Sequence, residues 1–392
     1  MSRFIVLLAA FFPLTGAMSQ GTSVSDQGLT IEWQMAEDAY KKMKRKTLVE
    51  FEFQPAAMKI NREEVSAVSA HTRGKTSKKY WRKSYTISLE DKFSFSDSIA
   101  MKKFYLLSMS MDRNYLRNRL AFDCLSPLGV FPLWYQYVTL RINDRPEGLY
   151  MLVQRPADYA LKESRSHSIL RRQTTGLLAK EKFDKDISDE DRKLSLKTFE
   201  SISKDCAELA GKELFESLNV KLDMQSYFRW LAFNYLVRNG DYTDEVFYYA
   251  LPNSDPVRFG IIPWDFDDIL AKGPHEGAIK RAETLGDQLL FSSEDKLDRT
   301  IANDPYLYQR YLEEMATVCE VLTPKSLKGI TDNIFRDLRS YFLDDDVATL
   351  SQHDKDEIGS LKELREELTA IHNYLCTRRR MMMRLARHTS VN

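Results

Sequence analysis

The chain has 392 residues, of which 43% are hydrophobic and 29% are charged, the balance of an ordinary globular protein. Its 57 basic and 57 acidic residues cancel, so no overall field favours nucleic acid or a membrane surface, and we predict no nucleic-acid partner. A chain of this length exceeds a single compact core, which makes two lobes the expectation.

The first residues have the order of a cleavable signal peptide. Arg3 supplies a positive start, residues 4–12 are an unbroken apolar run, and Ala17 and Ser19 are small residues at the positions that a signal peptidase requires. The run is far shorter than the roughly 20 residues of a membrane-spanning helix, and no Cys follows it as a lipid attachment site. We therefore predict a signal peptide over 1–19, a secreted or periplasmic protein, and no transmembrane segment in the mature chain. An uncleaved anchor is the alternative.

Residues 20–157 are expected to form a sheet-rich N-terminal lobe. Alternating apolar residues predict strands, and recurrence at three and four residues predicts helices. Turn residues at 143–148 lie between two alternating runs, which is typical of a hairpin. In chain order, the expected elements are a short helix over 31–44, strands over 47–53 and 82–89, a helix over 112–126, and hairpin strands over 138–142 and 149–153.

Residues 158–392 are expected to form a mainly helical C-terminal lobe. Residues 161–195 are polar and charged, which favours a loop or insertion with some helix. A buried helix from Met224 ends at Asn239-Gly240, a tight hairpin follows over 247–262, and residues 305–387 have helical periodicity. A sheet-rich lobe followed by a helical lobe is an α+β fold.

The segment 239–268 places acidic residues directly after the buried helix and again after the hairpin. Asp241 follows the helix, and Asp265 and Asp267 follow the second hairpin strand. Protein kinases place two carboxylates in this order, one at the substrate hydroxyl and one on the magnesium ion that bridges the phosphates. Because Mg²⁺ takes hard oxygen ligands, we predict Asp241 as catalytic and Asp265 and Asp267 as metal ligands. A capping cluster at a helix start is the alternative.

A second set of residues, at 73–83, combines glycine, hydroxyl and basic side chains. Gly74 beside Arg73 and Ser77 makes a flexible loop whose amides and side chains can hold phosphate oxygens. Lys83 follows in an expected strand, where its ammonium can bind nucleotide phosphates and support catalysis. We predict Arg73, Ser77 and Lys83 as nucleotide ligands. The alternative is an edge-strand lysine whose charge lies in solvent.

Five motifs follow one another in order along residues 73–270. They are Arg73-Gly74-x-Thr76-Ser77 with Arg82-Lys83-Ser84-Tyr85, Asp112 with Leu116-Arg117-Asn118-Arg119-Leu120-Ala121, Asn143 with Gly148-Leu149-Tyr150, Asn239-Gly240-Asp241, and Ile262-Pro263-Trp264-Asp265-Phe266-Asp267. In these motifs the chain resembles the CotH kinase family, the atypical secretory and spore-coat kinases named after spore coat protein H.

The resemblance implies a two-lobed, atypical protein-kinase-like fold that uses ATP with Mg²⁺ or Mn²⁺. It implies transfer of the γ-phosphoryl group to Ser or Thr of a protein substrate, which the sequence does not identify. By position it implies that Lys83 binds phosphate, Asp241 is the catalytic carboxylate, and Asp265 is the main metal ligand.

Two positions depart from the family pattern. Gln154 stands where a Glu is usual, near the expected hinge or nucleotide, and we include it among the nucleotide-binding residues. Val246 stands where an Asn often serves as a second metal ligand, and valine cannot ligate a metal. Asp244 and Glu245 are the candidate substitutes.

Two other functions stay open. One is a catalytically weak or inactive nucleotide-binding relative that acts in envelope or surface protein assembly. The other is a structural calcium site at 241–268, although EF-hand spacing is absent and such a site has no use for Arg73 and Lys83. The four cysteines form no Cys-x-x-Cys pair, and neither their disulfide state nor the oligomeric state is predicted.

Overall fold

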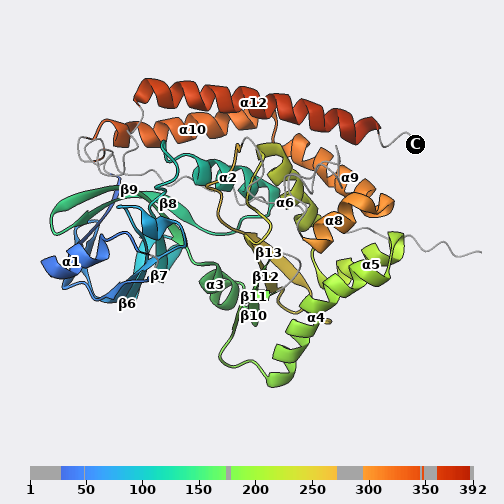
Figure 1. Cartoon of the computed structure of the whole chain (residues 1–392), viewed down its shortest axis with the longest axis horizontal. Coiled ribbons are helices and arrows are strands. Elements are labelled where there is room, and N and C mark those ends of the chain that lie inside the picture. Colours follow the sequence, from blue (N-terminus) through green and yellow to red (C-terminus); the bar gives the residue numbers. More distant parts are fainter. Residues whose placement is uncertain are drawn as a thin grey trace, which may run out of the picture.

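The computed structural model describes residues 28–47, 49–173, 178–271, 295–344, 347 and 360–388. The signal peptide predicted for residues 1–19 lies outside this part of the chain. Within the described ranges, no helix is both long and apolar enough to cross a membrane. Figure 1 shows a curled sheet at one end of the molecule and helices at the other.

The N-terminal half is a sheet whose nine described strands have the order β2-β5-β6-β7-β9-β8-β1-β3-β4. The β8–β9 hairpin turns at Asn143 and Asp144, whose positive φ angles of 52° and 60° suit a two-residue hairpin turn. The elements of this half are β1 (Leu29–Gln34), α1 (Glu37–Met43), β2 (Glu52–Phe53), β3 (Ala57–Ile60), β4 (Glu63–Val65), β5 (Ala67–Arg73), a 3-10 turn (Ser77–Lys79), β6 (Ser84–Ser96), β7 (Ile99–Leu107), α2 (Arg117–Leu125), a 3-10 turn (Ser126–Leu128), β8 (Tyr135–Ile142) and β9 (Arg145–Gln154).

The helix predicted over 31–44 is wrong in its first part, because β1 is a strand. Leu29, Ile31 and Trp33 are buried, whereas Thr30 and Glu32 between them are half-buried. This strand runs parallel to β8 and antiparallel to β3, so its hydrogen bonds come from distant parts of the chain. The helix begins only at Glu37, and the strand predicted over 47–53 shortens to β2.

Strand β9 separates two hydrophobic cores. Tyr150 and Leu152 pack into the core inside the N-terminal sheet. Leu149, Met151 and Val153 face the opposite way, into the larger core that the C-terminal helices share. A strand buried on both faces reads as a continuous apolar run, as this one does. All four cysteines are free thiols, so no disulfide links these cores.

The C-terminal half surrounds a small sheet, whose described strands have the order β11-β10-β12-β13, with helices. In Figure 1 the helices α4 to α12 lie beside and beyond this sheet. The elements are α3 (Pro156–Asp158), a π-helical turn (Tyr159–Glu163), β10 (Ser168–Arg172), β11 (Leu178–Phe183), α4 (Asp189–Glu208), α5 (Gly211–Lys221), α6 (Met224–Val237), β12 (Val246–Ala250), β13 (Phe259–Pro263), α8 (Lys296–Asn303), α9 (Pro305–Val321), α10 (Pro324–Phe342) and α12 (Leu361–His388).

The loop or insertion predicted over 161–195 is wrong for β10 and β11, which are strands, whereas the helix expected within this segment is present as the start of α4. Strand β10 pairs with β12, with Ile169 opposite Tyr249, a partner far along the chain. The α+β fold class is confirmed, with a sheet-rich N-terminal region and a helical C-terminal region. The predicted α6 helix, the β8–β9 hairpin and the β12–β13 hairpin are present as well.

Candidate active site

Two loops that carry the predicted carboxylates lie side by side. The first follows α6 at Arg238, which adopts a left-handed conformation (φ 48°), and the second follows β13. Backbone hydrogen bonds join them, from Gly240 N to Asp268 O (3.0 Å) and from Trp264 N to Glu245 O (2.8 Å). A Cβ atom at Gly240 would overlap the carboxylate of Asp268, so any larger residue would displace that side chain.

Carboxylates from both loops gather into one cluster. Burial raises the pKa of Asp267 to about 8, helped by the charge and hydrogen bond of Asp265 and the charges of Asp241 and Asp268. Burial also raises the pKa of Glu245 well above its usual value, and the charge of Asp265 adds to this. Carboxylates that resist ionisation in this way are typical of sites that hold a cation or move a proton.

This donor set fits a divalent ion that is bound together with phosphate. Mg²⁺ needs only one or two protein carboxylates when phosphate oxygens and waters complete its shell. No group of three or more Asp, Glu, His or Cys side chains is arranged as a metal site in the part of the chain that is described.

Helix α2 holds the second loop in place. Asn118 Oδ1 accepts a hydrogen bond from Phe266 N (3.2 Å), and Arg117 Nη1 donates to Asp267 O (2.8 Å). The ring of Phe266 packs edge-on against Phe122, with centroids 5.9 Å apart. Asp265, directly before these anchored residues, is exposed and has φ 54°, a conformation that costs energy for a residue other than glycine. The side chains of Arg117 and Asn118, from the motif at 116–121, therefore hold the backbone of this loop.

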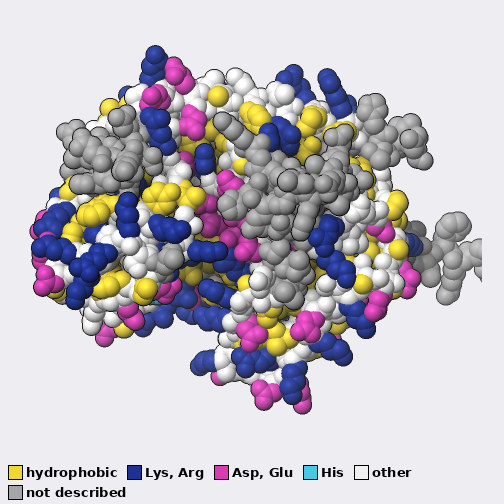
Figure 2. Space-filling model, viewed as in Figure 1, with side chains coloured by type: hydrophobic (Ala, Val, Ile, Leu, Met, Phe, Trp, Pro, Cys, Tyr) yellow, Lys and Arg dark blue, Asp and Glu magenta, His cyan; other side chains and the backbone are white. Residues whose placement is uncertain are grey.

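Two arginines from different sheets stand beside the carboxylates. The guanidinium carbon of Arg73 lies 3.8 Å from the ring centroid of Tyr105. Desolvation lowers the pKa of Arg73, while the charges of Tyr105, Asp265 and Glu245 oppose that effect. Arg171 Nη2 lies 2.5 Å from Glu245 Oε2. Figure 2 shows acidic side chains gathered near the middle of this face, with Lys and Arg side chains beside them.

The other predicted basic and hydroxyl residues close the loop between β5 and β6. Lys83 comes directly before β6, is 1% exposed, and donates from Nζ to the carbonyl of Lys78 (2.6 Å). Ser77 Oγ donates to Arg73 O (2.8 Å) across Gly74, whose φ is 89°. These contacts fix the turn that follows Arg73, the last residue of β5.

Gln154 lies at the end of β9, where the chain passes into the C-terminal half. Its Oε1 accepts from Trp134 N (3.1 Å), and its Nε2 donates to Glu163. Val246 is fully buried in the core opposite Pro263 and cannot reach a ligand. Glu245, one residue earlier, is the candidate substitute that the structure brings into electrostatic contact with Asp265.

Sequence reasoning missed Arg171 and the contribution of Tyr105. Arg171 lies on β10, in the segment that was predicted as a loop. Its Nε donates to Asp244 O (3.0 Å), so it also holds the loop that contains Asp241. The available signal was the apolar pair Ile169 and Leu170 within this short strand, which the surrounding charged residues obscure.

The sequence model of the family described as CotH kinase protein matches residues 70–382. The inner spore coat protein H of Bacillus subtilis (strain 168) is 27% identical over 240 residues, which cover 56% of this chain and 63% of that protein. A HipA–HipB–operator DNA complex of Shewanella oneidensis MR-1 aligns over 78% of this chain and 65% of the matched chain, at 10% identity. Its TM-score of 0.29 is too low to support an argument. From the family match, over most of its length, the chain belongs to the CotH kinase family and is a kinase-like protein.

Proposed function

We propose that this protein transfers the γ-phosphoryl group of ATP to Ser or Thr of a protein substrate, with Mg²⁺ or Mn²⁺. The observation that carries the proposal is the cluster of Asp241, Glu245, Asp265 and Asp267 beside the guanidinium of Arg73. Carboxylates for a metal and arginines for phosphate are the groups that phosphoryl transfer requires, since its catalysis consists mainly of positioning and charge stabilisation.

Each residue has a role that suits its place. Asp265 and Asp267 would hold a divalent ion, which would neutralise charge on the phosphates, and Glu245, the candidate substitute for the missing Asn, would act on this site through its electrostatic contact with Asp265. Asp241 would orient the substrate hydroxyl and accept its proton. Arg73 would bind phosphate oxygens through its planar group of donors.

Three further residues complete the proposed nucleotide site. Lys83 and Ser77 would shape the turn between β5 and β6 and contribute to phosphate binding. Gln154 would lie near the nucleotide at the passage between the two halves.

Export is part of the proposal. It rests on the order of residues 1–19, and the name of the Bacillus relative, a spore coat protein, agrees with a surface-associated role. Mass spectrometry of the native protein tests this point. A terminus near Gln20 is expected, and an intact Met1 would contradict cleavage.

The deciding experiment is phosphoryl transfer from labelled ATP by the purified mature protein, with Mg²⁺ or Mn²⁺. We expect autophosphorylation or labelling of a generic protein, lost in Asp265→Ala and retained in Glu216→Ala, which changes an exposed carboxylate on α5. Binding of ATP without any transfer by the wild type would replace this proposal with the inactive nucleotide-binding alternative. Absence of metal-dependent nucleotide binding would reject both.

A further inference from the structure

A group of basic side chains from four elements lies beside the candidate active site. We call it the basic tract, and it consists of Lys103 on β7, Arg155 directly after β9, Lys162 in the π-helical turn and Lys182 on β11. Partial desolvation lowers the pKa of Lys182, and the other three charges of the tract add to this shift, whereas Asp158 opposes it. The four cations are therefore close enough to repel one another. Figure 2 shows Lys and Arg side chains below the acidic cluster, between the two halves.

Tyr105 connects the basic tract to the carboxylate cluster. The guanidinium carbon of Arg155 lies 5.7 Å from the ring centroid of Tyr105, and that of Arg73 lies 3.8 Å from it. The two guanidinium groups are thus at most about 10 Å apart, the span of roughly three residues of an extended chain. Because Arg73 is in electrostatic contact with Asp265, the tract begins within a few residues' length of the proposed metal site.

The small sheet provides a second connection. Lys180 lies opposite Arg171 in the β10–β11 pair, and Arg171 contacts Glu245 of the carboxylate cluster. Side chains two residues apart on a strand project from the same face, so Lys182 shares this face with Lys180. A basic surface therefore leads from the cluster to the exposed residues of β11.

The basic tract carries more positive than negative charge. Asp158 is shared between Arg155 Nε (3.4 Å) and Lys162 Nζ (2.9 Å). Among the residues that the structure describes, Lys103 and Lys182 have no acidic side chain in ion-pair contact. The surplus charge is available to an anionic ligand.

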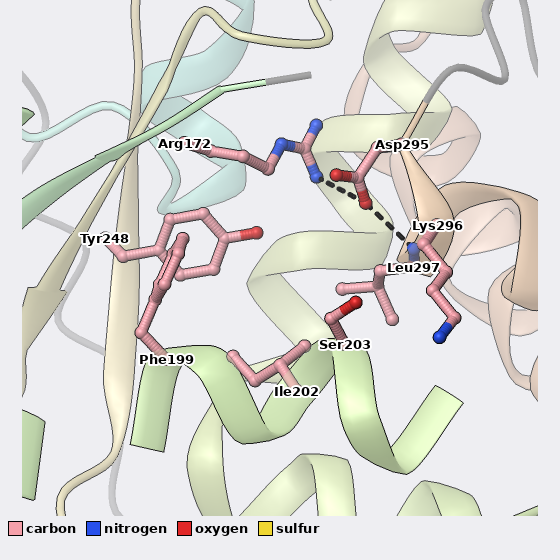
Figure 3. Close-up of a pocket in the computed structure, with 8 residues that line it drawn as sticks. All are labelled: Arg172, Phe199, Ile202, Ser203, Tyr248, Asp295, Lys296 and Leu297. Carbon is pink, nitrogen blue, oxygen red and sulfur yellow. Dashed lines mark hydrogen bonds and ion pairs between the residues drawn. The ribbon is translucent and has the colours of Figure 1, made fainter. Parts of the chain in front are cut away.

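Figure 3 shows the opposite arrangement, in which a basic side chain is already matched. Arg172 is buried, its Nη1 lies 3.3 Å from Asp295 Oδ1, and its Nη2 lies 3.2 Å from Asp298 Oδ2. A buried cation requires such partners, whereas water solvates the more exposed tract until an anion binds.

Protection of a sheet edge explains only part of the tract. Lysines on an edge strand often prevent its pairing with another chain, and this role would account for Lys180 and Lys182 on β11. It does not account for Lys103, Arg155 and Lys162, which belong to other elements and converge on the same place.

We propose that the basic tract binds acidic residues of the protein substrate, a few residues away from the Ser or Thr that receives the phosphoryl group. This inference rests on the proposed function and names the class of its substrate. Arg73, with Arg171 beside it, would match the phosphates of the nucleotide, which leaves the outer cations for a second anion. A polypeptide whose hydroxyl group reaches Asp241 continues over the neighbouring surface, where the tract provides complementary charge.

Fluorescence anisotropy of the purified mature protein tests this binding without catalysis. The probe is a fluorescein-labelled peptide of alternating Ser and Glu residues, and its control has Gln in place of each Glu. We expect a Kd on the order of 10 μM for the Ser–Glu peptide at low ionic strength, and weaker binding at higher salt, because salt screens exposed charges. The Ser–Gln peptide should bind at least about tenfold more weakly.

Charge-reversal variants test the residues. Lys103→Glu and Lys182→Glu change exposed side chains of the tract, and each should weaken binding of the Ser–Glu peptide at least about fivefold, because an attraction becomes a repulsion. Lys325→Glu makes the same change at an exposed position of α10, away from β7 and β11 in Figure 1, and should bind as the wild type does. In the phosphoryl-transfer assay, the two tract variants should raise the KM for the peptide by a similar factor and leave the affinity for ATP with Mn²⁺ unchanged.

No binding of the Ser–Glu peptide, equal binding of both peptides, or unchanged affinity in both tract variants would overturn the proposal. Displacement of the peptide by saturating ATP with Mn²⁺ would assign the tract to the nucleotide site and would also overturn it. Equally tight binding of a single-stranded oligonucleotide of the same charge would do so as well. Selective peptide binding without any phosphoryl transfer would refute the proposed function and leave the binding surface, whereas transfer without selective binding would refute the surface alone.

Discussion

Replacing Asp267 by asparagine is expected to stabilise the metal-free protein at alkaline pH while it weakens metal binding. The pKa of Asp267 rises from 3.8 to about 8 in the folded protein, because of burial and the neighbouring charges of Asp265 and Asp241. At a pH between these two pKa values, Asp267 keeps its proton in the folded state and releases it in the unfolded state. The stability of the wild type therefore falls as the pH rises from about 4 to about 8.

The size of the pKa shift of Asp267 sets how much folding stability the wild type loses at high pH. Four pKa units at about 1.4 kcal/mol each give an upper limit of about 5–6 kcal/mol. Because Asp267 is not fully buried, solvent screens part of this interaction, and we expect roughly 2–3 kcal/mol. Asparagine carries no charge at any pH, so the stability of the variant should not fall in this way as the pH rises. The two proteins should have similar stability near pH 4 and differ most above pH 8.

Urea unfolding with a chelator at pH 4.5, 7 and 8.5 measures this difference in the free energy of unfolding. Glu216→Gln, an exposed carboxylate change on α5, is the control, and its difference from the wild type should not change with pH. Titration with Mn²⁺ at pH 8.5 should show weaker binding by Asp267→Asn. A variant that is less stable than the wild type at pH 8.5, or a difference that stays constant with pH, would refute the assignment of Asp267 to a repulsive carboxylate cluster.

Four further substitutions separate the roles of the site residues. Asp265→Asn should weaken binding of ATP with Mn²⁺ far more than Asp244→Asn, by calorimetry, and equal losses would contradict this ranking. Asp241→Asn should slow phosphoryl transfer by a factor on the order of 10² or more, while the affinity for ATP stays within a few-fold. The reason is that a group that acts mainly in the transition state changes kcat. Unchanged phosphoryl transfer would show that another carboxylate is catalytic. Lys83→Ala should weaken both ATP binding and turnover in the same assays. Asn118→Ala should lower stability by about 1–2 kcal/mol and weaken Mn²⁺ binding, because Phe266 N loses its acceptor, whereas Glu216→Gln should change neither.

Local patterns predicted those parts of the fold whose partners are close in sequence. The β8–β9 and β12–β13 hairpins and α6 each form from residues within one short segment, so periodicity and turn residues were sufficient. Strand β1 was missed because its hydrogen bonds come from β8 and β3. Strand β10 was missed although it also pairs with the neighbouring β11, because this segment has few apolar residues and its other partner, β12, lies beyond α4, α5 and α6. Non-local pairing leaves no local signal, so the charged residues of this segment suggested a loop.

In the candidate site, too, residues within one short segment were predicted and a residue from a distant strand was missed. Asp241, Asp265 and Asp267 lie in a segment whose local order already indicates a site, and the structure brings them together. Arg171 was missed with its strand, although it lies 2.5 Å from Glu245. Spacing alone also left Asp244 and Glu245 equivalent as substitutes for the missing Asn. Only the three-dimensional arrangement, which brings Glu245 into electrostatic contact with Asp265, separates them.

The position of Asp265 depends on contacts from both halves of the chain. Its left-handed backbone (φ 54°) is unfavourable for an aspartate, so neighbouring contacts must maintain it. Asn118, from α2, binds the next residue through Phe266 N, and the hydrogen bond from Trp264 N to Glu245 O fixes the preceding one. The first contact comes from the N-terminal half and the second from the β12–β13 hairpin. Helix α2 packs in the same core as the C-terminal helices, so the carboxylate of Asp265 is held in place by α2 and the β12–β13 hairpin together, and the proposed metal binding would depend on both.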